Sequence, residues 1–328
     1  MLTQQKALLN LVRFNYLDDS KTKCKSWHKE DHRRIPIREL LTRLEASGLY
    51  LDKIRFIGMA HQYGSPEAFA EDFIDLHNQN SFEPFFLAIF ELWRRLLPNH
   101  QTISIFCDEL DQRIYSYDKG MLSNDELIQN ALAHLEELLD EHVDTGAHPE
   151  KLFEYVCSFC AHDIESFLYD YIYELIEDGN KVYASELIDS FYPYISDVKW
   201  FDFLRIKLFA ATDVLEVNVI LKNILKDIEK SNDIAFYLTL LRFMVKIGDR
   251  SLFIELVRKT LRLINKNQEL EVLLLIVLHF YRCIDQEDIE RKTQRYISFL
   301  SKKRKNDPLD KNNKMYLELI SYLTPSGY

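Results

Sequence analysis

The sequence predicts an all-α protein in which helical hairpins repeat and stack as an α-solenoid. The 328 residues include only 8 glycines and 8 prolines, which suits long helices better than a turn-rich β fold. Apolar residues recur with a helical period along most of the chain. Turn-like breaks also recur at a nearly constant interval. With 47% hydrophobic residues, the chain can build a sizeable core.

The clearest helical stripe lies at residues 164–176. Its apolar positions follow the first by three, four, seven, eight, eleven and twelve residues, so they share one face of a helix: Ile164, Phe167, Leu168, Tyr171, Ile172, Leu175 and Ile176. Elsewhere four local signals predict helix starts: Ser65-Pro66, Glu83-Pro84, a capping box from Ser123 to Glu126, and His148-Pro149.

The breaks lie at Gly179-Asn180, Thr212-Asp213, Gly248-Asp249 and Ile284-Asp285. Successive breaks are 33, 36 and 36 residues apart. Each break separates two helical stretches of roughly a dozen residues or more. Helix pairs at this period are typical of α-solenoids.

Two of these breaks resemble the inter-helix turn of tetratricopeptide repeats. That family has a Gly, then Asn or Asp, and a small residue five positions after the Gly. Gly179-Asn180 with Ala184 matches this pattern, whereas Gly248-Asp249 has Phe253 at the last position. Thr212-Asp213 keeps only the Asp, and the closing proline of the repeat is mostly missing. The resemblance implies a right-handed superhelix whose inner surface binds peptides or protein segments.

Two regions are expected along the chain. Residues 1–80 are predicted to form an N-terminal helical region, and residues 81–325 a helical-repeat domain. The repeats are clearest at about residues 160–300, where the resemblance extends. Residues 19–36 are polar and charged with little periodicity, so we expect a mobile loop there.

The chain carries no pattern expected of a secreted or membrane-spanning protein. Its N-terminus lacks the features of a signal peptide. The longest apolar stretch, Val272 to Phe280 with only His279 interrupting it, is far shorter than the about 20 residues of a membrane span. Five cysteines, an odd number without a secretory signal, favour a reducing compartment without disulfides. A cytoplasmic location is therefore expected.

The net charge of −11 is concentrated in one block. Residues 121–200 contain 18 acidic and 3 basic residues, whereas residues 201–328 contain 17 acidic and 22 basic residues. Such a block repels nucleic acid and favours a basic protein or peptide partner. The basic run Lys302-Lys303-Arg304-Lys305 suits a solvated helix end better than a nucleic-acid patch.

The predicted partner-binding residues lie within the acidic block. Tyr169 and Tyr173 fall outside the apolar stripe of their helix, four residues apart, and acids surround them at Glu165, Asp170 and Glu177. Tyrosine is enriched at binding surfaces. The alternative is that a neighbouring helix buries both rings.

No motif presents a complete catalytic or metal-binding set, so no metal or cofactor is expected. Phosphate-binding glycine loops and the G-x-S-x-G nucleophile elbow are missing. Cys24, His28, Asp31 and His32 form the densest ligand-type group, but Lys29 stands where a zincin motif requires Glu. Cys157 and Cys160 lack a second C-x-x-C pair and are predicted to be buried thiols within a helix.

One catalytic alternative stays open. His162-Asp163 resembles the metal-binding pair of HD-superfamily phosphohydrolases, with His134 or His142 as the upstream His and Asp197 or Asp213 as the distant Asp. That family usually continues with Ile-Gly-Lys, whereas this chain continues with Ile164-Glu165-Ser166. The resemblance implies metal-dependent phosphoester hydrolysis.

The sequence therefore favours a non-catalytic interaction scaffold, adaptor or chaperone-like module that docks a basic partner on the acidic block. An HD-type phosphohydrolase is the first alternative. A secreted effector or toxin-associated protein is the second.

Overall fold

The computed structural model describes residues 4–74, 79–210, 212–227, 232–247, 249–301, 303–304 and 306–323. Within these ranges the regular structure is helical and contains no β-strand, and the predicted all-α class is confirmed. An antiparallel bridge joins Lys266 to Pro308. None of the helices described here combines the length and the apolar character that crossing a membrane requires.

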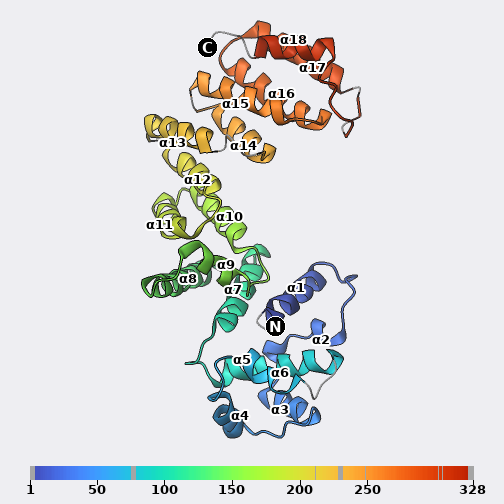
Figure 1. Ribbon diagram of the computed structural model, residues 1–328, viewed down its shortest axis with the longest axis vertical. Helices are drawn as coiled ribbons and strands as arrows, with labels where there is room; N and C mark the ends of the chain where they lie inside the picture. The colour runs from blue at the N-terminus through green and yellow to red at the C-terminus, as the bar shows by residue number, and fades with distance from the viewer. Residues whose placement is uncertain are drawn as a thin grey trace. The chain divides into compact units, whose positions relative to one another are not determined.

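The chain divides into two compact units, which are described separately (Figure 1). Unit 1 comprises residues 1–170 and 193–196, and unit 2 comprises residues 171–192 and 197–328. This division differs from the predicted boundary at residue 80. That position falls at the start of a long helix, α6, which packs against the helices before it.

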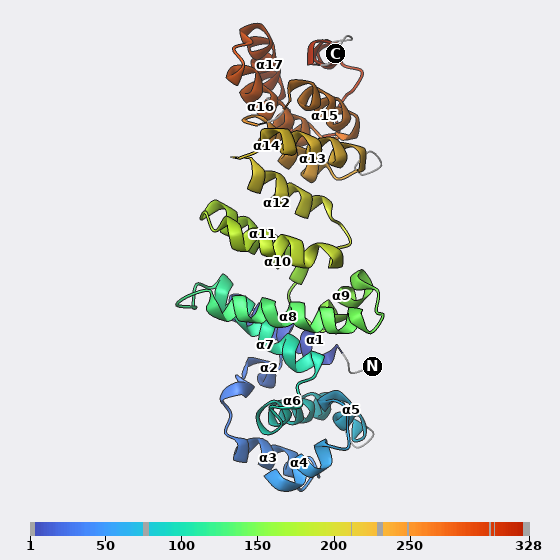
Figure 2. The ribbon, with the colours of Figure 1, turned by 90° about the vertical axis from the view of Figure 1, so that its left-hand side faces the viewer.

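The helices of unit 1 pack in two groups, one around α6 and the other around α7. Helices α3, α4 and α5 pack against α6, whereas α1, α8 and α9 pack against α7. Figure 2 shows α8 and α9 beside α7. The elements are α1 (Gln5–Asp18), α2 (Ser26–Lys29), the 3₁₀ helix η1 (His32–Arg34), α3 (Ile37–Ala46), α4 (Lys53–Ala60), α5 (Pro66–Glu71), α6 (Gln79–Leu96), α7 (Ile103–Asp118), α8 (Glu126–Asp144), α9 (Pro149–Cys157) and α10 (Ile164–Glu177), which continues into unit 2.

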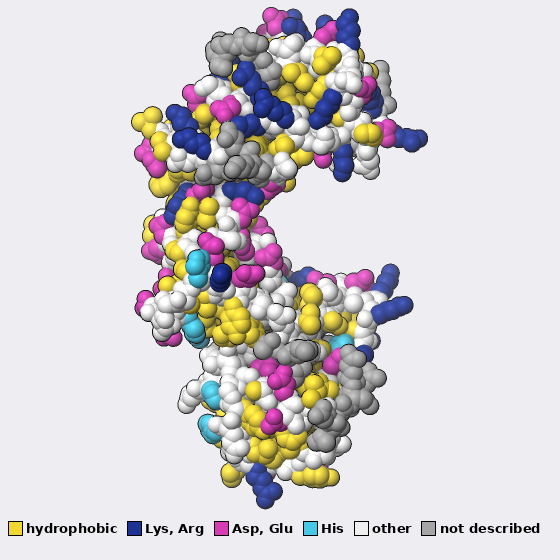
Figure 3. All heavy atoms as spheres, viewed as in Figure 1, with side chains coloured by type: hydrophobic (Ala, Val, Ile, Leu, Met, Phe, Trp, Pro, Cys, Tyr) yellow, Lys and Arg dark blue, Asp and Glu magenta, His cyan; other side chains and the backbone are white. Residues whose placement is uncertain are grey.

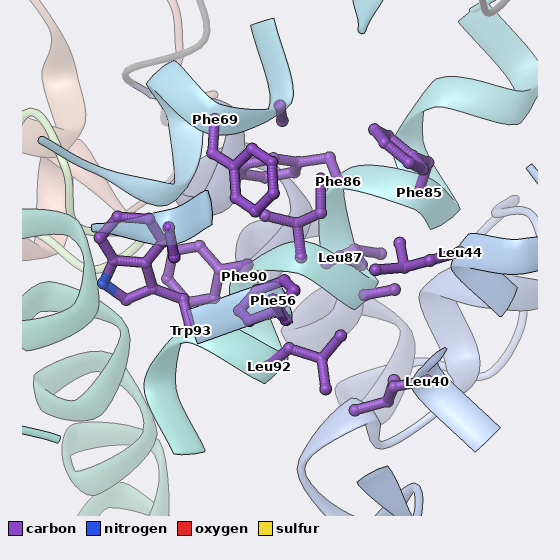
Figure 4. Close-up of a cluster of buried hydrophobic side chains, with 14 of the residues drawn as sticks. Leu40, Leu44, Phe56, Phe69, Phe85, Phe86, Leu87, Phe90, Leu92 and Trp93 are labelled. Atoms are coloured by element: carbon purple, nitrogen blue, oxygen red, sulfur yellow. The ribbon is translucent and has the colours of Figure 1, made fainter. Parts of the chain in front are cut away.

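The core of unit 1 is built around α6 (Figure 4). Between Phe85 and Trp93 nearly every side chain of α6 is buried. A helix that is apolar on all sides has to be surrounded by other elements, and α3, α4 and α5 supply that cover. Their contributions to the core include Leu40, Leu44, Phe56 and Phe69.

Residues 19–36 are not the loop without regular structure that the sequence predicts. They contain α2 and η1 and are held against α6. The Arg95 guanidinium donates to the backbone carbonyls of residues 32, 33 and 35 at 2.6–2.8 Å, and Trp27 Nε1 donates to Glu83 at 3.0 Å. These bonds join residues more than 50 positions apart, so local sequence patterns do not reveal them.

Unit 2 consists of successive helices whose boundaries follow the predicted breaks. The elements are α11 (Lys181–Phe191), α12 (Lys199–Phe209), α13 (Val214–Asp227), α14 (Ile234–Met244), α15 (Arg250–Leu263), α16 (Asn267–Cys283), α17 (Glu287–Leu300) and α18 (Lys314–Leu323). The 3₁₀ helix η3 (Tyr192–Tyr194) begins in unit 2 and continues into unit 1. The breaks at 179–180, 212–213 and 284–285 separate helices as expected. Gly248 lies outside the described residues, and Asp249 caps α15.

The helices of unit 2 pack in a regular order. Helix α12 packs against α13, α14 against α15, and α16 against α17, while α13 also packs against α15 and α14 against α16. Phe253 of α15 stacks on Phe280 of α16 with ring centroids 3.8 Å apart. Gly179, at the turn between α10 and α11, has a φ of 85°, a conformation that glycine adopts without steric cost.

Two helix-start predictions are confirmed and two are wrong. Ser65 Oγ accepts from the backbone N–H of Ala68 at 3.1 Å with Pro66 at the first helical position, and α9 begins at Pro149. Helix α8 begins at Glu126 with Asp125 at the cap, so Ser123 lies outside the helix. Pro84 lies inside α6 rather than at its start.

Candidate functional site

The outer face of α8 in unit 1 carries uncompensated negative charge. The inner face of α8 is an apolar stripe, and the acidic residues lie on the other side of the helix. The buried residues of the stripe are Ile128, Ala131, Leu132, Leu135 and Leu139. Glu137, Glu141 and Asp144 are exposed, and Glu136 is half-buried. None of these four carboxylates forms an ion pair within the described part of unit 1. From residue 121 to residue 170 the sequence offers one basic residue, Lys151, against twelve acids.

An open groove of about 470 Å³ runs along this face. Glu137 and Glu141 supply its acidic wall, and the half-buried Ile103 and Leu138 supply apolar surface. Its other lining residues are Gly64, His100, Gln101, Thr102, Phe106, His134 and His142. The rings of Phe106 and His134 lie 4.9 Å apart. Histidine side chains, cyan in Figure 3, are visible along this side of the unit.

This arrangement suits the long side chains of a basic segment. Lysine and arginine have apolar stems that can lie on surfaces such as Ile103 and Leu138, while their charged ends remain near carboxylates. An exposed ion pair contributes only about 0–1 kcal/mol, so the adjoining apolar surface matters as much as the charge. Asp140 is already engaged, because the hydroxyl of Tyr194 donates to it.

The five predicted partner-binding residues lie on α10, which crosses the division between the units. Tyr169, Glu165 and Asp170 belong to unit 1, whereas Tyr173 and Glu177 belong to unit 2. The apolar stripe of α10 is buried as predicted. Both tyrosines lie outside it and are half-buried.

In unit 2 a cation of the same chain already occupies the surface predicted for the partner. Lys207 Nζ lies 3.9 Å from the centre of the Tyr173 ring and 2.5 Å from Glu177 Oε1. Helix α12 therefore supplies a basic group to Tyr173 and Glu177. The partner-binding role of the five residues stays a prediction.

The His162-Asp163 pair is engaged in local structure. Asp111, which is fully buried, accepts from the backbone N–H groups of Ala161 and His162 and lies 2.9 Å from His162 Nδ1. The Asp163 carboxylate accepts from the Ser166 N–H and hydroxyl at the start of α10. These contacts fix the turn that leads into α10.

The other proposed metal ligands also have separate partners. His142 Nδ1 lies 2.8 Å from the Leu138 carbonyl, Asp197 pairs with Lys199, and Asp213 caps α13. His28 Nε2 lies 3.2 Å from Glu83 Oε2. Across the described ranges, no group of three or more His, Cys, Asp or Glu side chains is placed to hold a metal ion.

Cys157 and Cys160 are only partly within a helix. Cys157 is the last residue of α9, and Cys160 lies beyond its end, where it contacts Cys107 of α7. Burial raises the pKa of the Cys157 thiol. A hydrogen bond with Cys107, together with burial, raises the pKa of the Cys160 thiol. Raised pKa values oppose thiolate formation and therefore nucleophilic reactivity.

A buried charge network joins α1, η1 and α7. Asp108 is 3% exposed and pairs with Lys6 Nζ at 2.6 Å and with Arg33, while Asn10 donates to it at 2.9 Å. Burial alone raises the pKa of Asp108, but the charges of Lys6 and Arg33 outweigh this effect and hold the pKa well below its usual range. Burial, with a smaller effect of the Lys6 charge, lowers the pKa of His32 to about 4.

A small cavity of about 30 Å³ adjoins this network. Arg13 Nε and His32 Nε2 line it without a hydrogen-bond partner. A cavity of this size holds about two water molecules, so it has no room for an organic substrate.

No protein-family model matches the chain, and no curated protein sequence and no solved structure matches it at a significant level. The groove on α8 is the site that sequence reasoning missed. The acidic block pointed to α8, but the proximity of residues 100–106 depends on the packing of α7 against α8.

Proposed function

We propose that the protein is a non-catalytic interaction scaffold and that the groove on α8 binds a basic segment of another protein. The observation that carries this proposal is the pair Glu137 and Glu141, four residues apart on the groove wall and unpaired with any base in the described residues. A basic partner relieves the self-repulsion of such a surface and is attracted to it at long range.

We further propose that unit 2 is a TPR-like α-solenoid segment. The order of packing supports this proposal, because α12 to α17 form neighbouring pairs, while α13 also packs against α15 and α14 against α16. Ala184, the small residue of the turn pattern, is fully buried. The cysteines at 24, 107, 157, 160 and 283 all have free thiols that form no disulfide, which supports a reducing compartment such as the cytoplasm.

Charge reversal on the groove wall tests the binding proposal. We expect the double variant Glu137→Lys, Glu141→Lys to bind a Lys/Arg-rich peptide at least about tenfold more weakly than the unchanged protein. Fluorescence anisotropy at low salt measures this affinity. Because both side chains are exposed, the melting temperature should be nearly unchanged.

A matched control separates the groove from the general acidity of the unit. Glu150 and Glu154 of α9 are also exposed and four residues apart, but they do not line the groove. The variant Glu150→Lys, Glu154→Lys has the same net charge and should weaken binding much less. Equal losses in the two variants would show that the field of the whole block, rather than the groove, attracts the peptide.

A further inference from the structure

Helix α13 in unit 2 has an outer side that no element of the described unit covers. Its buried side contains Val217, Leu221 and Ile224, and the helix packs against α12 and α15. On its outer side, Leu215 is 79% exposed and Val219 is 51% exposed. Neighbouring apolar side chains this exposed indicate a contact surface.

The outer side has the spacing of a helix–helix seam. Leu215, Val219, Lys222 and Lys226 follow one another by four, three and four residues, which is the spacing of core positions in a coiled coil. The seam is about 16 Å long at 1.5 Å per residue. Its first turn is fixed, because Asp213 accepts from the N–H groups of Leu215 and Glu216 at 3.0 Å.

The second half of the seam is positively charged. Lys222 and Lys226 are exposed and have no ion-pair partner in the described part of unit 2. The hydrogen bond from Ser251 and, to a smaller extent, the charge of Lys222 lower the pKa of Asp249. Figure 3 shows hydrophobic side chains next to Lys and Arg side chains over α13.

We propose that this seam binds an acidic amphipathic helix of a partner protein. Apolar side chains of that helix pack on Leu215 and Val219, and its carboxylates lie near Lys222 and Lys226. A helix matches the four-three-four spacing, whereas side chains on one face of an extended strand recur every two residues. This surface lies in unit 2 and prefers the charge opposite to that preferred by the groove on α8, so the chain carries two docking surfaces of opposite charge.

A designed peptide tests the proposal on the full chain. The probe is a helical peptide with Leu at two successive seam positions and Glu at the next two, and anisotropy measures its affinity. We expect Leu215→Gln with Val219→Gln, and separately Lys222→Glu with Lys226→Glu, each to weaken binding at least about tenfold. Val182→Gln is the control, because Val182 is 74% exposed on α11, outside the seam, and should change nothing.

Three results would overturn the proposal. The first is equal binding of a scrambled peptide with the same composition, which would show that charge alone acts. The second is full competition by a DNA duplex. The third is a monomer–dimer equilibrium of the chain that the seam variants abolish, because it would assign the seam to a second copy. The variant Glu137→Lys, Glu141→Lys should bind the probe normally, so failure here is independent of the function proposed for the groove.

Discussion

Replacing Asp108 by Asn tests whether the buried charge network holds the N-terminal helix and residues 19–36 in place. The substitution keeps the size of the side chain but removes the negative charge that pairs with Lys6 and Arg33. Both cations are largely buried, with exposed side-chain fractions of 14% and 21%. Without the Asp108 carboxylate, both cations would lie in the protein interior with less negative charge to balance theirs.

The structure sets the expected size of the loss. Breaking a buried ion pair by removing one partner costs about 3–5 kcal/mol. Arg33 keeps its bond to Glu109 at 2.8 Å, so we expect the lower end, about 3 kcal/mol. For a unit of this size that corresponds to a fall in melting temperature of about 6–12 °C.

Hydrogen–deuterium exchange locates the loss. Amides of α1 and of η1 should exchange on the order of a hundredfold faster in Asp108→Asn, whereas amides of unit 2 should be unaffected. Adding Lys6→Met removes one of the stranded cations and should restore part of the stability. Unchanged exchange in α1, or a double variant less stable than the single one, would refute the account of the network.

Two further predictions concern a buried histidine and the tyrosines of α10. Because burial lowers the pKa of His32 from 6.5 to about 4, the unfolded chain binds a proton at a higher pH than the folded chain. The free energy of unfolding should therefore fall by roughly 3 kcal/mol as pH drops from about 6.5 to about 4. Urea unfolding measures this free energy, and its dependence on pH should be flatter for His32→Gln than for the unchanged protein. Tyr169→Ala with Tyr173→Ala should keep the far-UV circular dichroism spectrum, and it separates the surface predicted on α10 from the groove on α8, which neither tyrosine lines. Unchanged binding of the basic peptide is expected for the groove, whereas weaker binding would assign the peptide to α10. A loss of several kcal/mol in stability with unchanged binding would assign both rings to packing.

The helices were largely predictable because their signals are local. The stripe from Ile164 to Ile176 and the breaks near residues 180, 212 and 284 depend on neighbouring side chains and turn residues, and the structure places helices and turns there. Pro84 was misread as a helix start. It removes one backbone donor, but the buried aromatic residues that follow it keep α6 continuous.

Long-range contacts were not predictable from local patterns. Residues 19–36 have the composition of a loop, yet Arg95 and Asp108 hold them through bonds that span more than 60 positions. In the same way, Lys207 reaches Tyr173 from another helix. The acidic block was visible in the sequence, whereas the groove wall formed by Glu137 and Glu141 required the packing of α7 against α8.

Carboxylate footprinting tests the central claim most directly. Carbodiimide coupling of an amine to exposed carboxylates, read by mass spectrometry, compares the free protein with its complex with the Lys/Arg-rich peptide. Binding in the groove predicts that Glu137 and Glu141 lose reactivity in the complex, whereas Glu150 and Glu154 of α9 keep theirs. Uniform protection of all four carboxylates, or protection confined to α9, would contradict the assignment of the groove on α8 as the docking site.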